Sequence, residues 1–112
     1  MKILLHVTEL NKVETSLGNA KNFLATDNKA KVEILINGSA AIALQEKVAK
    51  NIGIYEALSE LAEKKVDICV CNNSLTRFDI DKERLCSFVE VVTAGIIEVA
   101  IKQEEGYSYA KI

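Results

Sequence analysis

Apolar residues in this chain fall into short blocks, and the blocks are of two kinds. Some are nearly continuous or alternating runs, which are typical of strands; in others the apolar residues recur at steps of three and four, which is typical of helices. The expected strands are 2–7, 32–37, 66–71, 88–92 and 107–112. The expected helices are 10–24, 41–48, 54–62 and 93–103, with one further turn of helix inside 73–85.

The order of these elements indicates the fold class. Strands that alternate with helices of this length predict βαβ units and a mostly parallel sheet. The first three strands are almost wholly apolar, as expected where helices cover both faces of a sheet. We therefore expect one domain over residues 1–112, a three-layer α/β/α fold with about five strands. No linker or internal repeat interrupts it.

Polar residues and glycines mark the expected ends of the helices. Thr8 or Asn11 could cap the first helix, and Asn11 with Glu14 resembles a capping box. Thr93 is expected to cap the last helix, and Gly106 is placed to end it.

Composition narrows the function classes. The chain has 112 residues, 14 basic and 16 acidic, and a net charge of -2 with no basic cluster, which argues against a nucleic-acid surface. No apolar stretch approaches the roughly 20 residues needed to span a bilayer, and residues 1–9 lack the features of a signal peptide. Three cysteines without a signal argue against a disulfide framework. We expect a cytoplasmic protein that binds neither nucleic acid nor membrane.

Cys71 is the residue that best combines position and chemistry. It closes the third expected strand and is followed at once by a polar turn, Asn72-Asn73-Ser74. Open parallel sheets place their ligand crevice at the carboxyl ends of the strands. A helix starting just beyond Cys71 would favour the thiolate, which is the reactive form of cysteine. The alternative is that Cys71 is only a small core residue, as free cysteines often are.

The other strand ends bring further polar residues to the same edge. They are His6, Asn37, Gly38, Asn72, Asn73 and Gly95, and Arg77 lies a short way downstream of Cys71. These residues could bind a small anion or support a thiolate, but each also has a structural explanation: a satisfied histidine, a surface salt bridge or a turn glycine. Cys69 and Cys86 are expected to be packing residues. The Cys69-x-Cys71 spacing is too tight for a usual zinc site, and no nucleotide-binding or nucleophile-elbow motif occurs, so no metal or cofactor is expected.

Several stretches together resemble the DsrE/DsrF-like family of small sulfur-relay proteins, in particular its single-domain branch. The stretches are 18–24, 32–38, 70–75, 91–98 and 103–109. The resemblance implies that Cys71 occupies the position at which sulfur-transferring members carry sulfane sulfur as a persulfide. It further implies that Arg77 matches the basic residues that often follow that cysteine, and that the protein forms a trimer or hexamer. Asn72 and Asn73 depart from the small residues usual after the cysteine.

Two hypotheses follow. The first is a sulfur-relay protein, a sulfurtransferase or sulfur carrier, which accepts sulfur on Cys71 from a donor protein and passes it to an acceptor protein. The second is a non-catalytic oligomeric module that binds a small anion or a protein partner, with Cys71 as packing. A flavodoxin-like cofactor carrier is disfavoured, because residues 8–11 lack a hydroxyl-rich phosphate cradle.

Overall fold

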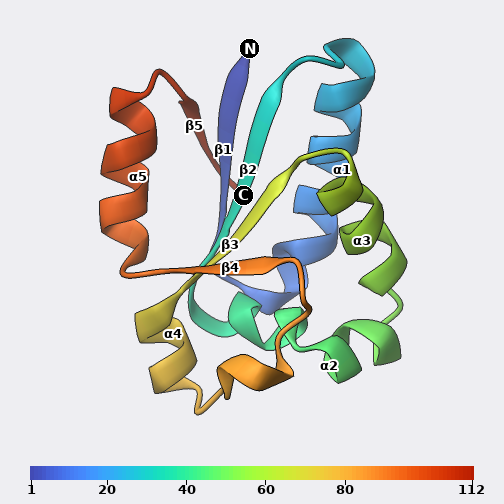
Figure 1. Cartoon of the computed structure of the whole chain (residues 1–112), viewed down its shortest axis with the longest axis vertical. Coiled ribbons are helices and arrows are strands. Elements are labelled where there is room, and N and C mark those ends of the chain that lie inside the picture. The colour runs from blue at the N-terminus through green and yellow to red at the C-terminus, as the bar shows by residue number, and fades with distance from the viewer.

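A five-stranded parallel sheet forms the centre of the protein in the computed structural model, which describes all 112 residues (Figure 1). The strands are β1 (Lys2–Val7), β2 (Lys31–Ile36), β3 (Asp67–Cys71), β4 (Val89–Val92) and β5 (Ser108–Lys111). Their order across the sheet is β4-β3-β2-β1-β5, and every neighbouring pair is parallel. The predicted α/β class is confirmed, and the sheet is wholly rather than mostly parallel.

Helices cover both faces of this sheet. The α-helices are α1 (Val13–Thr26), α2 (Glu46–Asn51), α3 (Tyr55–Glu63), α4 (Asn72–Arg77) and α5 (Gly95–Glu104), and the 3-10 helices are η1 (Leu10–Lys12), η2 (Gly38–Leu44) and η3 (Lys82–Arg84). Figure 1 shows α1 and α3 on one side and α5 on the other, with α4 at the end of β3. The expected three layers are therefore present, and α5 is the main cover of its face.

The two faces of the sheet are packed very unequally. Side chains alternate between faces along each strand. The face under α1 and α3 belongs to a cluster of 22 buried residues. The face under α5 belongs to a cluster of only four, Leu4, Leu35, Cys69 and Tyr107. Much less apolar surface therefore holds α5 to the sheet.

The ends of the helices differ from the sequence expectations in three places. The capping box of Asn11 and Glu14 is wrong: the chain enters α1 through η1, and Lys12 is the N-cap with no side-chain hydrogen bond. Thr93 does not cap α5, because the N-cap is Ala94. The expected helix 41–48 is instead the 3-10 helix η2 followed by α2. Gly106 does end α5, in the left-handed conformation with φ of 92°.

The helices and the cysteines bear on two further expectations. None of the helices is both long enough and apolar enough to cross a bilayer. All three cysteines are free and buried.

Candidate functional site

Cys71 lies at the junction of β3 and α4, where it is the last residue of the strand and the N-cap of the helix. Only 3% of its surface is exposed, yet it belongs to neither apolar cluster. It lines a surface pocket of about 500 Å³, together with Thr8, Asn37, Gly38, Asn73, Ser74, Arg77, Ala94, Gly95 and Ile96. The pocket collects residues from the ends of four elements, as expected at the carboxyl edge of a parallel sheet. We call it the Cys71 pocket.

Hydrogen-bond donors surround the sulfur of Cys71. Burial by itself acts to raise the pKa of this thiol, but the backbone N–H groups of Ser74, Gly95 and Asn73 and the hydroxyl of Ser74 lower it, and their effect outweighs that of burial. The net result is that the pKa of Cys71 is lowered from its ordinary value. Donors that stabilise the charged form of a group have this effect. The surroundings of Cys71 therefore favour the thiolate.

Ser74 links two of the strand ends at this pocket. Its Oγ accepts a hydrogen bond of 2.8 Å from the backbone N–H of Gly38, which follows β2. The same hydroxyl is left to donate its proton to Cys71. Ser74 is only 6% exposed, so water does not compete for these contacts. Ser74 is not among the site residues expected from the sequence, although it stands in the turn that follows Cys71.

Gly38 is required here for two reasons. Its φ of 59° lies in the left-handed region that side chains disfavour, and a Cβ atom would stand 2.6 Å from the carbonyl oxygen of Thr8. A larger residue would move the backbone N–H that orients Ser74. The glycine therefore lets β1 and β2 end close together beside the thiol.

Asn37 is held in one orientation by a chain of hydrogen bonds. Its Oδ1 lies 2.7 Å from Nε2 of His6, and Nδ1 of His6 lies 2.6 Å from the hydroxyl of Tyr109. Because Oδ1 can only accept, Nε2 of His6 is the donor, and in the neutral ring Nδ1 accepts from Tyr109. Gly95 leaves room for this amide: a Cβ there would come within 2.4 Å of Asn37 Nδ2 and Oδ1. His6 therefore supports the pocket indirectly, through Asn37.

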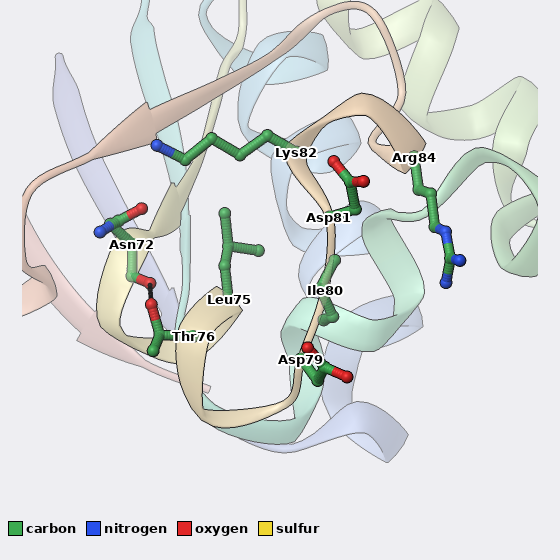
Figure 2. A pocket seen from close by; sticks show the side chains of 8 residues that line it. All are labelled: Asn72, Leu75, Thr76, Asp79, Ile80, Asp81, Lys82 and Arg84. Atoms are coloured by element: carbon green, nitrogen blue, oxygen red, sulfur yellow. Dashed lines mark hydrogen bonds between the residues drawn. The ribbon is translucent and has the colours of Figure 1, made fainter.

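Asn72 lies apart from the other residues that were expected at the site. It lines a neighbouring pocket of about 490 Å³ formed by α4 and the segment leading to η3 (Figure 2). There the backbone carbonyl of Asn72 accepts a 3.3 Å hydrogen bond from the hydroxyl of Thr76. Acidic and basic side chains, such as Asp81 and Lys82, both line this second pocket. Of the residues expected beside Cys71, the Cys71 pocket thus contains Asn37, Gly38, Asn73, Arg77 and Gly95, but not Asn72 or His6.

The other two cysteines differ from Cys71 in their surroundings. Cys69 is 2% exposed and Cys86 is 1% exposed, and both belong to apolar clusters. Burial raises the pKa of both thiols, and nearby carboxylates add to the effect. Their structural role as packing residues agrees with the sequence expectation.

The fold and the pocket define a small three-layer α/β domain with one polar-lined cysteine at the end of a central strand. The chain belongs to the DsrE/DsrF-like family, whose model matches residues 1–111.

Several solved structures share this fold. A protein of unknown function, MTH1491, from Methanobacterium thermoautotrophicum is 22% identical, with a TM-score of 0.87 over 99% of this chain and 98% of that chain. The ychN protein from E.coli is 17% identical, with a TM-score of 0.81 over the full length of both chains. No curated protein is significantly similar to this chain. At these identities the likeness establishes the fold alone.

Proposed function

We propose that the protein is a sulfur carrier that holds sulfane sulfur as a persulfide on Cys71. The observation that supports this most is the polar pocket that Cys71 lines, in which three backbone N–H groups and the Ser74 hydroxyl lower the pKa of the thiol. Membership of a family that includes sulfur-relay proteins supports the same assignment. The three free thiols fit a reducing compartment, so we place the protein in the cytoplasm.

The proposed reaction is an exchange of sulfur between thiols. The Cys71 thiolate attacks the outer sulfur of a donor persulfide, R–S–SH, so that a new S–S bond forms and the donor S–S bond breaks. The donor leaves as the thiol R–SH, and Cys71 carries the persulfide anion, Cys71–S–S⁻. An acceptor thiolate then attacks the outer sulfur and releases the Cys71 thiolate. No net oxidation occurs, and the donors of the pocket bind an anion at each stage.

Mass spectrometry tests this proposal directly. After incubation with a sulfurtransferase and thiosulfate, we expect the wild-type protein to gain the mass of one sulfur atom, and dithiothreitol to remove it. The Cys71→Ser variant should gain none. The matched control, Cys86→Ser, keeps Cys71 and should gain sulfur as the wild type does. A Cys71→Ser protein that still acquires the sulfur would show that another residue carries it.

A second candidate function uses the same pocket without covalent chemistry. Arg77 lines the pocket and forms no ion pair with an acidic side chain, so its charge is available to a small anion. In that case thiosulfate alone would raise the melting temperature of both the wild type and Cys71→Ser, and no sulfur would be transferred.

We also propose that the protein assembles into a homo-oligomer, a trimer or a hexamer, through the outer side of α5. Ile96, Ile97 and Ile101 are 76%, 53% and 44% exposed on this helix. Large exposed apolar side chains that lie next to one another are typical of surfaces that are covered by a partner.

The outer side of α5 gives a testable expectation for assembly. Light scattering of the wild type should give three or six times the 12.3 kDa mass of one chain. Ile97→Lys places a charge on this side of α5 and should shift the protein to a monomer, whereas Ile52→Lys, at a residue that is 47% exposed at the end of α2, should not. A monomeric wild type would contradict the proposed assembly.

A further inference from the structure

Glu33 is a carboxylic acid in the middle of an apolar strand. It lies in β2, its side chain is 1% exposed, and it faces α5. Its Oε1 lies 3.6 Å from Nζ of Lys102, a residue of α5. Its Oε2 is buried and receives no hydrogen bond from any donor. A buried carboxylate oxygen without a hydrogen-bond partner destabilises the folded state, so the groups around Glu33 must offset this cost.

A second carboxyl group lies beside Glu33. The side chain of Glu98, a residue of α5, approaches Glu33 and raises the pKa of its carboxyl group. Oxygen atoms of both, together with the sulfur of Cys69, lie within 4.8 Å of one another. The other titratable groups that act on this cluster are Asp67 from β3, Glu90 from β4, Lys102 from α5, and Glu105 and Tyr107 from the turn that follows α5.

Two ionised carboxylates in contact repel each other, and neither can donate a hydrogen bond. A single proton removes both difficulties, because a protonated carboxyl donates to the other. One proton on the pair, with the charge of Lys102 beside it, also leaves the group electrically neutral. Burial, the hydrogen bond to Glu98 and the negative charge of Glu98 raise the pKa of Glu33 to about 8, against the opposing effect of Lys102. The pair is therefore protonated once at neutral pH.

We propose that Glu33 and Glu98 share one proton, and that this bond positions the start of α5 at the Cys71 pocket. Glu98 lies three residues after Gly95, so both are on the inner side of the helix. The backbone N–H of Gly95 is one of the donors at the Cys71 sulfur, and the same residue abuts the Asn37 amide. Glu33 is thus a positioning residue: it acts on Cys71 indirectly, through α5. The consequence for sulfur transfer rests on the proposed function, whereas the shared proton does not.

The sign of the pH dependence follows from the raised pKa. The unfolded chain ionises Glu33 near its ordinary value of 4.5, while the folded protein keeps the proton up to about 8. The contribution of the shared proton to stability is complete below the lower value and is lost as the pH rises towards the upper one. Above that pH two charges face each other beneath α5, and the Gly95 N–H moves away from the thiolate.

Infrared spectroscopy tests the shared proton without reference to sulfur chemistry. We expect the wild type at neutral pH to show the carbonyl stretch of a protonated carboxyl group, shifted in D₂O and lost at alkaline pH. Glu33→Gln and Glu98→Gln should each lack this band, and Glu98→Gln provides the test at a partly exposed position if Glu33→Gln does not fold. The control Glu90→Gln, also an acid near the cluster, should keep it. Absence of the band in the wild type would overturn the proposal.

The pH profile of Cys71 alkylation tests the positioning role. In Glu33→Gln no pair of carboxyl groups remains beneath α5, so no second ionisation moves the Gly95 N–H away from the thiolate as the pH rises. Cys71 should therefore titrate in one step, with a lower apparent pKa than in the wild type. A shift of about 0.5 unit would give roughly a threefold larger ratio of thiolate to thiol. Glu90→Gln should give the same profile as the wild type. This result would show that removing a nearby negative charge is not enough to lower the apparent pKa of Cys71. Identical profiles in all three proteins would remove Glu33 from this role.

A zinc ion is the alternative occupant of this cluster. The wild type and Glu33→Gln, together with Cys69→Ala, distinguish a bound zinc ion from a shared proton. If added zinc raised the melting temperature of the wild type but not that of Glu33→Gln or Cys69→Ala, and the infrared band were absent, the cluster would bind a metal rather than a proton. With a shared proton, zinc at low concentration leaves the melting temperature of all three unchanged. If sulfur transfer failed but the infrared band were present, the proposed sulfur-carrier function would be wrong and the shared proton would still hold.

Discussion

Iodoacetamide should alkylate Cys71 in the native protein at neutral pH at least about 100-fold faster than Cys69 or Cys86. The thiolate is the reacting species, and each unit of pKa changes its population about tenfold. The pKa of Cys71 is lowered by the surrounding donors, against the effect of burial, whereas burial raises the pKa of the other two thiols. Quenched alkylation followed by peptide mass spectrometry measures the three rates separately.

The unfolded protein supplies the control for this experiment. In guanidinium chloride the three cysteines should react at similar rates, because the contacts that distinguish them are lost. Ser74→Ala removes the hydroxyl that donates to Cys71 and should slow its reaction several-fold, with no change at Cys86. Equal rates at all three thiols in the native protein would contradict the thiolate environment and weaken the sulfur-carrier proposal.

The second large effect is expected at Leu35. Leu35→Ala should lower the free energy of unfolding by about 2–5 kcal/mol, the usual cost of truncating a buried leucine. Leu35 is fully buried in the four-residue cluster under α5, where few other apolar side chains hold the helix. Urea unfolding measures the loss, and hydrogen exchange should show the amides of α5 exchanging faster than those of α3.

Leu58→Ala is the matched control on the other face of the sheet. Leu58 is 1% exposed and belongs to the cluster of 22 residues. This variant should lose a comparable amount of stability but leave α5 protected and the alkylation rate of Cys71 unchanged. If Leu35→Ala and Leu58→Ala changed the alkylation rate of Cys71 equally, the position of α5 would not depend on the four-residue cluster beneath it.

The strands could be predicted from sequence because their signal is local. Apolar runs of branched residues define β1 to β3 to within one residue, and the alternation with helices implies the parallel sheet and its carboxyl edge. That edge brings Cys71, Asn37, Gly38 and Gly95 together as expected. The capping box of Asn11 and Glu14 failed because a 3-10 turn precedes α1, so the residues that the motif pairs do not stand at the N-cap.

Tyr109 could not be predicted, because its role depends on contacts distant in the sequence. Its hydroxyl meets His6 only once β5 has paired with β1. Asn72 follows Cys71 directly, but the first turn of α4 directs it to the neighbouring pocket, a rotation that the sequence pattern does not specify. Glu33 did leave a signal: it is a single acid inside a continuous apolar run, and such a residue is buried only with a partner.

The pairing of β5 with β1 has a consequence for synthesis on the ribosome. Residues 2–7 are made before the other strands, and β2 can pair with one side of β1 soon afterwards, but the other side waits for residues 108–111. Until then the nascent chain presents an open strand edge, which is prone to pairing with other chains. Slow translation of the last helix would lengthen this interval, so cells under translational stress should accumulate more aggregated protein.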